Sequence, residues 1–269
     1  MINQKIEIWE GQYKATLTTY LLDNTPEIDK NRTRPLVIIC PGGGYRFVSE
    51  REAEPVALQF AAMGFHSCIL RYSIYPAQFP TAITQLAKAV AYVREHAKEW
   101  NVNHDKILVG GFSAGGHLAA SLGTLWHEKF LEDRMQMPKE NYQPNGMILS
   151  YPVISSGQYA HRDSFTALLQ EQYEELLEKV SLEKQVTRNT PPAYIWHTFE
   201  DELVPIENTL LFASAMNEQK IPFELHIYQR GGHGLSLANE ETRGENDPSP
   251  CQTECQNWIT MAGTWLGKL

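Results

Sequence analysis

Short apolar runs recur along the chain, separated by segments in which apolar residues stand three and four positions apart. The runs are nearly continuous, which is typical of strands in a parallel sheet that is covered on both faces. They are LVIIC (36–40), HSCIL (66–70), KILVG (106–110), GMILS (146–150), AYIWHT (193–198) and FELHIY (223–228). Two earlier segments, KIEIW (5–9) and ATLTTYLL (15–22), alternate polar and apolar residues and therefore predict antiparallel edge strands.

The intervening segments have the spacing of helices. The clearest covers residues 81–101, where six apolar residues fall on one stripe that we expect to face the sheet. They are Ile83, Leu86, Val90, Val93, Ala97 and Trp100. Further helices are predicted over EPVALQFAAMG (54–64), IENTLLFASAMNEQ (206–219) and CQNWITMAGTWL (255–266). This alternation predicts an α/β fold with a doubly wound, mostly parallel sheet, in which ligands bind beyond the carboxyl ends of the strands.

Residues 152–190 interrupt the alternation. They form a charged, partly helical stretch between two predicted strands, and they are too long for an ordinary connection. We expect this insertion to be a small helical cap over the strand ends. The simplest organisation is a single domain, residues 1–269, that carries the cap.

Composition and charge narrow the class of protein. The chain is 42% hydrophobic and carries a net charge of −9, which argues against binding to nucleic acid or to an anionic membrane surface. The sequence contains neither a long apolar run nor an N-terminal signal pattern, so we expect no membrane span and a cytoplasmic location. The four cysteines lack the spacing of a metal site or a disulfide framework, and no metal is expected.

Two tryptophans in the last predicted helix bear on assembly. Trp258 and Trp265 are seven residues apart and therefore lie on the same helical face. Such a pair either packs against the sheet or forms the face of a homodimer, and the sequence leaves both arrangements open.

One serine stands in a turn between a predicted strand and a predicted helix. Residues 111–115 read G-F-S-A-G, after the strand KILVG and before the small-residue segment AGGHLAASLGTL. This is the setting of a nucleophile elbow, in which a sharp turn exposes a serine hydroxyl at the edge of the sheet. A helix N-cap explains Ser113 but not the glycines on both sides. We therefore interpret Ser113 as a nucleophile.

A serine hydroxyl needs a base, and the base needs a carboxylate that orients it. His233 lies in the glycine-rich loop YQRGGHGLSL, directly after the strand FELHIY, where it can approach Ser113. Two other histidines, His197 and His226, fall within predicted strands and are interpreted as packing residues. The segment HTFEDELVP offers three acids directly after a strand, which either orient the histidine or cap the next helix. They are Glu200, Asp201 and Glu202.

A glycine run follows the first parallel strand. In CPGGGYRF, three consecutive glycines let backbone amides approach a ligand closely. Together with the amide of Ala114, they can donate to the oxyanion that forms during acyl transfer.

The order of oxyanion loop, serine, acid and histidine resembles that of the α/β-hydrolase family, and more narrowly that of small bacterial esterases of the acetyl-xylan-esterase, or carbohydrate-esterase, type. The resemblance runs from LVIICPGGGY through GGFSAGGHLAASL and WHTFEDELVPIENTLLFASAM to ELHIYQRGGHG. It implies that the D-x-x-V-P aspartate, Asp201, is the triad acid. Glu200, in the same acidic segment, is the alternative. The resemblance also implies that Gly43, Gly44 and Ala114 donate to the oxyanion. Pro41 stands where the HGGG branch of esterases has a histidine.

The resemblance implies hydrolysis of short-chain carboxylic esters, especially acetyl esters of sugars, through an acyl-enzyme and without a cofactor. The expected partner is a small-molecule ester. Tyr45 is expected to bind the substrate, and the aromatic residues Tyr151 and Phe199 are further candidates for the pocket. The alternative for all three is that they are ordinary core or rim residues. Two other interpretations stay open: an amide hydrolase of the aryl formamidase or small peptidase type, and a non-catalytic ligand-binding protein.

Overall fold

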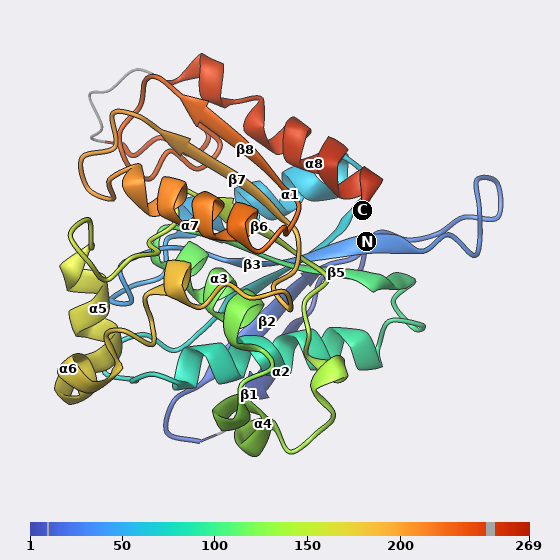
Figure 1. Ribbon diagram of the computed structural model, residues 1–269. Coiled ribbons are helices and arrows are strands. Elements are labelled where there is room, and N and C mark those ends of the chain that lie inside the picture. Colours follow the sequence, from blue (N-terminus) through green and yellow to red (C-terminus); the bar gives the residue numbers. More distant parts are fainter. Residues whose placement is uncertain (10, 246–250) are drawn as a thin grey trace.

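Within the part of the chain that the structure describes, the strands form one eight-stranded sheet with helices on both faces (Figure 1). The computed structural model describes residues 1–9, 11–245 and 251–269. The strands are β1 (Lys5–Trp9), β2 (Ala15–Tyr20), β3 (Arg34–Cys40), β4 (His66–Arg71), β5 (Val102–Phe112), β6 (Gly146–Ser150), β7 (Ala193–Thr198) and β8 (Phe223–Tyr228). Their order in the sheet is β1-β2-β4-β3-β5-β6-β7-β8. β1 and β2 pair antiparallel, as does β2 with β4, and the strands from β4 and β3 through β8 run parallel.

The helices lie between the strands in sequence and cover the sheet in space. The α-helices are α1 (Glu54–Ala62), α2 (Thr81–Glu95), α3 (Ala114–Leu125), α4 (Lys129–Met135), α5 (Arg162–Leu169), α6 (Tyr173–Leu176), α7 (Glu207–Glu218) and α8 (Trp258–Lys268). Short 3₁₀ turns are η1 (Glu50–Glu52), η2 (Lys139–Asn141), η3 (Gln170–Gln172), η4 (Leu182–Lys184) and η5 (Thr253–Cys255). Among the described residues, none of these helices combines the length and apolar character needed to cross a bilayer.

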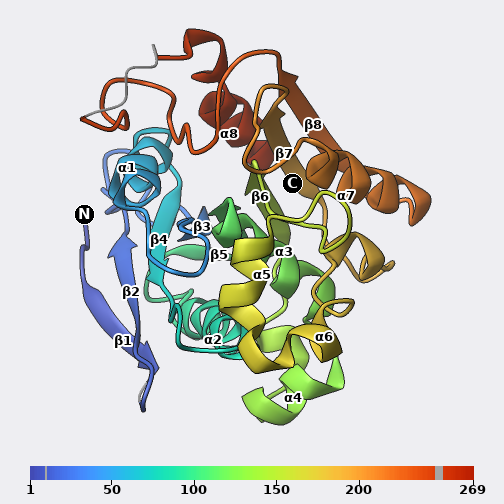
Figure 2. The ribbon, with the colours of Figure 1, turned by 90° about the vertical axis from the view of Figure 1, so that its left-hand side faces the viewer.

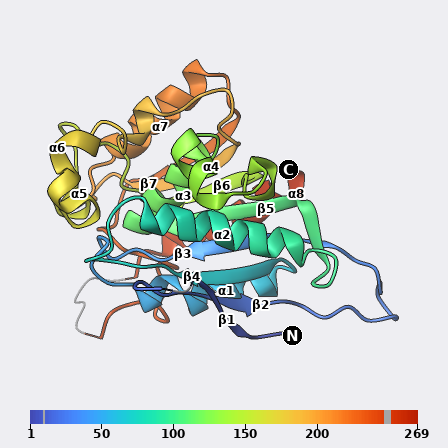
Figure 3. The ribbon, with the colours of Figure 1, turned by 90° about the horizontal axis from the view of Figure 1, so that it is seen from below.

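The core divides into two layers because successive side chains of a strand point to opposite faces. In β3, Leu36 and Ile38 belong to one apolar cluster, whereas Val37 and Ile39 belong to the other. The first cluster packs under α2, α3 and α7, and the second packs under α1 and α8. Figures 2 and 3 show the two layers from the side and from below, with α2 lying along one face. The doubly wound α/β sheet predicted from the sequence is confirmed.

The predicted helix over residues 81–101 is too long by two turns, because α2 ends at Glu95. The next strand begins at Val102, so the chain has to reverse direction within residues 96–101. Trp100 keeps its place on the buried stripe through a turn in which its amide donates to the carbonyl of His96, and both Ala97 and Trp100 are buried.

The two tryptophans of the last helix face the core. Trp258 is fully buried and stacks on Trp196 of β7, with ring centroids 5.2 Å apart, and Trp265 lies beside Tyr194. Of the two arrangements that the sequence left open, the structure shows packing against the sheet, since neither ring is available on the surface.

The insertion between β6 and β7 contains α5, η3, α6 and η4. Figure 1 shows α5 and α6, in yellow, at one end of the sheet, on the side toward which the strands β7 and β8 point. This is the carboxyl edge of the parallel strands, where the site described below is located. The division of the chain into one domain with a cap at about 152–190 stays a prediction.

Candidate active site

Ser113 sits in a sharp turn between the end of β5 and the start of α3. Its backbone angles are φ 53° and ψ −120°, a region that residues with side chains seldom occupy. The flanking glycines are required by close backbone approach: a Cβ on Gly111 would lie 2.0 Å from the carbonyl oxygen of Gly115. A Cβ on Gly115 would lie 2.0 Å from the carbonyl oxygen of Cys40. The two glycines therefore allow the tight turn around Ser113 and its close packing against the end of β3.

Three side chains from distant parts of the chain form one hydrogen-bonded line. Nε2 of His233 lies 2.7 Å from Oγ of Ser113, and Nδ1 of His233 lies 2.7 Å from Oδ2 of Asp201. An ionised carboxylate only accepts hydrogen bonds, so Nδ1 carries the proton and donates to Asp201. Nε2 is then the acceptor, and the hydroxyl of Ser113 donates to it. This is the tautomer that a general base requires.

Asp201 is held ionised by its neighbours although its side chain is fully buried. Burial alone raises the pKa of this carboxyl, but hydrogen bonds from His197 and His233 and the charge of His233 outweigh it and hold the pKa well below its usual range. The second oxygen, Oδ1, accepts the amide of Val204 at 2.9 Å. These contacts fix the carboxylate in position and orientation.

The alternative acid, Glu200, makes a different contact. Its carboxylate accepts the amide of Gly231 at 3.1 Å, two residues before His233 in the histidine loop. His197 is buried, and its Nε2–H faces both the carbonyl oxygen of Val204, at 3.0 Å, and Oδ2 of Asp201, at 3.3 Å. Its Nδ1 lies 2.8 Å from Oγ1 of Thr209. The structure thus brings Asp201, rather than Glu200, to the ring of His233.

The glycine loop after β3 lies beside the serine. Gly43 has φ 125° and a Cβ there would lie 2.1 Å from the carbonyl oxygen of Phe47, so only glycine fits. Within the described residues, the amides of Gly43, Gly44 and Ala114 have no hydrogen-bond acceptor. The amide of Ala114 is also the first of helix α3, where backbone N–H groups lack partners inside the helix. These three amides are available to a developing negative charge next to Ser113.

A cavity of about 240 Å³ opens over this serine. Its polar and apolar walls come from the glycine loop, η1, the start of α5 and the histidine loop. The lining residues are Gly43, Gly44, Arg46, Phe47, Ser49, Arg51, Glu52, Ser113, His161, Asp163, Leu203, His233 and Gly234. The insertion contributes His161 and Asp163, so it forms part of the wall.

Tyr45, expected to bind the substrate, does not line this cavity. Its side chain is 3% exposed and its hydroxyl donates to Nδ1 of His117 at 2.8 Å, because Nε2 of that ring donates to the carbonyl of Val180. The positive φ of 59° at Tyr45 turns the side chain inward, and the following residues, Arg46 and Phe47, point to the cavity instead. Tyr151 is buried as well, and Phe199 is 68% exposed.

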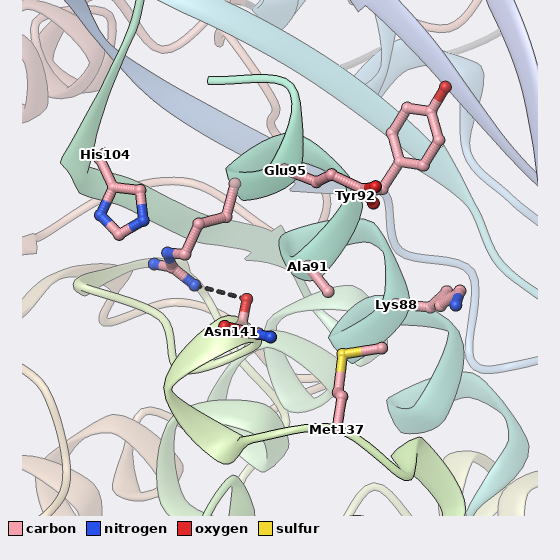
Figure 4. A pocket seen from close by; sticks show the side chains of 8 residues that line it. Lys88, Ala91, Tyr92, Glu95, His104, Met137 and Asn141 are labelled. Atoms are coloured by element: carbon pink, nitrogen blue, oxygen red, sulfur yellow. Dashed lines mark hydrogen bonds between the residues drawn. The ribbon is translucent and has the colours of Figure 1, made fainter. Parts of the chain in front are cut away.

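A second cavity, of about 440 Å³, lies far from this site. It is formed by the end of α2 and the beginning of β5, at the amino ends of the strands, and Figure 4 shows Tyr92, His104 and Met137 around it. Arg94 is its central cation, but its guanidinium already donates to the carbonyls of Asn141 and Gln143 and to the side chain of Asn145. The arginine ties the end of α2 to the loop that precedes β6 and offers little to a ligand.

Comparison with known proteins places the chain in a family. Residues 23–216 match the model of the BD-FAE family, and the chain belongs to that family. It is 38% identical over 213 residues to endo-1,4-beta-xylanase B of Butyrivibrio fibrisolvens and 29% identical over 217 residues to the acetylxylan esterase of Xylanibacter ruminicola. These matches cover 77% and 78% of the chain but only 33% and 43% of the two relatives. The chain thus spans less than half the length of these curated relatives.

Solved structures match over nearly the whole chain. The acetyl ester-xyloside bifunctional hydrolase of Caldicellulosiruptor lactoaceticus superposes with a TM-score of 0.84 at 32% identity, covering 98% of this chain and 96% of that one. The carboxylesterase Cest-2923 of Lactobacillus plantarum gives a TM-score of 0.88 at 27% identity, covering 100% and 98%. An α/β-hydrolase enzyme from a deep-sea metagenome gives 0.80 at 33% identity, covering 100% and 97%. The fold is that of the α/β hydrolases.

The sequence did not point to every side chain at this site. Glu52, His161 and Arg51 all line the cavity, but each lies in a segment with no motif around it. Their approach to Ser113 depends on how η1 and the insertion fold back over the sheet edge. Glu52 stands two residues before the predicted helix EPVALQFAAMG, a position as typical of a helix start as of a site.

Proposed function

We propose that the chain is a serine hydrolase that cleaves short-chain carboxylic esters through an acyl-enzyme. The observation that carries the proposal is the line from Ser113 to His233 to Asp201, with both hydrogen bonds 2.7 Å long and the imidazole in the tautomer of a base. The names of the related proteins, esterases and carboxylesterases, support the same class of reaction.

In the proposed mechanism, Oγ of Ser113 attacks the ester carbonyl while Nε2 of His233 takes its proton. Asp201 stabilises the imidazolium that forms, because its charge lies against Nδ1. The amides of Gly43, Gly44 and Ala114 hold the oxyanion of the tetrahedral intermediate. The imidazolium then protonates the leaving alcohol, and a water molecule activated by the same ring hydrolyses the acyl-enzyme.

We propose acetyl esters of sugars or oligosaccharides as the substrate class. The cavity combines a half-exposed ring, Phe47, with charged groups from Arg46 and Asp163, which suits a ligand that has both an apolar face and several hydroxyls. Acetylated xylose polymers and xylosides are named in two of the related proteins. The reaction needs no metal or organic cofactor in this mechanism.

Replacing the nucleophile tests the proposal. Ser113→Ala should lower kcat for p-nitrophenyl acetate and for acetylated xylo-oligosaccharides by at least about 1,000-fold, since no other group supplies the attacking oxygen. His233→Gln should do nearly the same, and His226→Gln is its matched control because His226 lies on the edge strand β8, paired with Glu224. Thermal unfolding checks that each variant folds.

Two results would contradict the proposal. One is full ester turnover by folded Ser113→Ala. The other is faster hydrolysis of an N-formyl aryl amide than of any acetyl ester, which would assign the site to amide cleavage. Comparison of acetyl, butyryl and feruloyl sugar esters then measures the acyl length that the cavity accepts.

A further inference from the structure

A buried carboxylate that the proposed mechanism does not use lies directly behind the reacting groups. Glu52, the last residue of η1, is 3% exposed, although its turn is at the surface and its neighbour Glu50 is exposed. A charged group in such a place is costly unless its hydrogen bonds are satisfied, so its contacts need a reason.

Both oxygens of Glu52 accept hydrogen bonds from parts of the site. The amide of Gly42, at the start of the glycine loop, donates to Oε2 at 2.7 Å. The hydroxyl of Tyr151, directly after β6, donates to Oε1 at 2.7 Å. Burial raises the pKa of this carboxyl, while the hydrogen bonds from Tyr151 and Gly42 act in the opposite direction. Because both partners are donors, the ionised form is the one that satisfies both at once. The close approach of Glu52 also requires glycine at position 42, because a Cβ on Gly42 would come within 2.8 Å of Oε2.

The contact continues into the histidine loop. The hydroxyl oxygen of Tyr151 accepts the amide of Ser236, three residues after His233, at 2.9 Å. The ring of Tyr151 meets the imidazole of His233 edge to face, with centroids 5.1 Å apart. The Oγ of Ser236 in turn donates to the carbonyl of Arg51, beside Glu52 in η1. One carboxylate therefore joins the glycine loop, the end of β6 and the histidine loop.

We propose that Glu52 is a positioning residue for the ester hydrolysis. This inference rests on the proposed function. Through Gly42 the glutamate fixes the loop whose next two amides face the oxyanion, and through Tyr151 and Ser236 it fixes the loop that carries the general base. Among the described residues, its carboxylate hydrogen-bonds to Gly42 and Tyr151 and not to Ser113 or His233. Its effect is to hold two loops, from opposite ends of the chain, at the spacing that attack by Ser113 requires.

Glu52→Gln tests this proposal. A glutamine side chain has one acceptor oxygen, so it cannot accept from both Gly42 and Tyr151, and at least one of the two hydrogen bonds is lost or reversed in direction. We expect kcat for an acetyl ester to fall roughly 10- to 100-fold, with KM changed less than about two-fold, because the loops are misplaced by a fraction of an ångström while the cavity keeps its walls. Glu50→Gln is the matched control, since Glu50 lies on the same turn but pairs with Arg71.

Tyr151→Phe removes the hydrogen bond between Glu52 and Tyr151 by deleting the tyrosine hydroxyl. This variant tests the proposal if Glu52→Gln does not fold. Because the two residues act in one chain of hydrogen bonds, the double variant should lose no more than about two-fold beyond the worse single variant. Hydrogen exchange of the segments 41–49 and 231–238 supplies a readout that does not depend on turnover. Exchange of both should increase in Glu52→Gln and stay unchanged in Glu50→Gln.

The proposal is overturned if folded Glu52→Gln keeps kcat within two-fold of the parent, if KM rises in proportion to the loss, or if the losses of Glu52→Gln and Tyr151→Phe simply multiply. If the unsubstituted protein itself does not hydrolyse esters, the proposed function is contradicted instead. The exchange data would still report, in that case, whether Glu52 anchors the two loops.

Discussion

Several neighbours together fix the charge and the orientation of Asp201. Its side chain is fully buried, yet two imidazoles and two backbone amides contact it, so every lone-pair direction of the carboxylate is used. The lowered pKa that results favours the ionised form of Asp201. The carboxylate therefore accepts the hydrogen bond from Nδ1 of His233.

Asp201→Asn should lower kcat on the order of 1,000- to 10,000-fold, because an amide group can donate to Nδ1 and stabilise the wrong tautomer. The measurement is the steady-state turnover of p-nitrophenyl acetate, with Asp105→Asn as the control, since Asp105 is exposed at the far end of β5. A loss below about ten-fold would mean that another acid, such as Glu200, orients the ring.

At the scale of elements, the turn between β5 and α3 depends on backbone contact rather than on side chains. Helix α3 begins so close to the end of β3 that the backbone of Gly115 touches the carbonyls of Cys40 and Pro41. This contact places the amide of Ala114 beside the glycine loop. Packing of one element against another thus brings the amides from two parts of the sequence to one point.

Gly115→Ala should destabilise the fold by about 1–3 kcal/mol and lower kcat, because the added methyl group pushes the helix away from β3. Gly267→Ala is the matched control: this glycine lies in α8, a Cβ there meets nothing within 4 Å, and the change should stabilise by about 0.5–1 kcal/mol. Urea unfolding measures both. Equal stability of the two variants would show that the approach of α3 to β3 is not tight.

The stability of the whole molecule should depend on two buried histidines. Burial lowers the pKa of His117 to about 4, and burial together with the charge of Arg34 lowers that of His66 to about 4. As the pH falls from about 6.5 to about 4, the unfolded chain binds protons at both rings before the folded chain does. The contribution of these two neutral rings to the free energy of unfolding is therefore complete above pH 6.5 and is lost as the pH falls through this window.

The expected loss is roughly 3 kcal/mol per fully shifted histidine by pH 4, which the free energy of unfolding in urea at pH 7 and pH 4.5 measures in part. His117→Gln should flatten the dependence on pH, although it also lowers stability at pH 7 by disturbing the contacts with Tyr45 and Val180. His104→Gln, an exposed site, should leave the slope unchanged. An unchanged slope in His117→Gln would contradict the assignment.

Local hydrophobic patterns in the sequence predicted much of the fold. The strands β6, β7 and β8 have the predicted bounds, because each is an apolar run between polar turns, and α7 is shorter than predicted by one residue at each end. Periodicity misjudged the end of α2, since residues 97 and 100 stay on the buried stripe in a turn that is no longer an α-helix. Hydrophobic spacing reports which face is buried and only indirectly which backbone conformation buries it.

The sequence by itself determined the α/β sheet, the elbow around Ser113 and the candidates for base and acid, because strand period, glycine turns and residue chemistry are local properties. Only the tertiary structure decided that Asp201 rather than Glu200 meets His233, that Tyr45 turns inward, and that Glu52 joins two loops. These depend on distances between segments far apart in the chain, set by the packing of the helices and the insertion on the sheet.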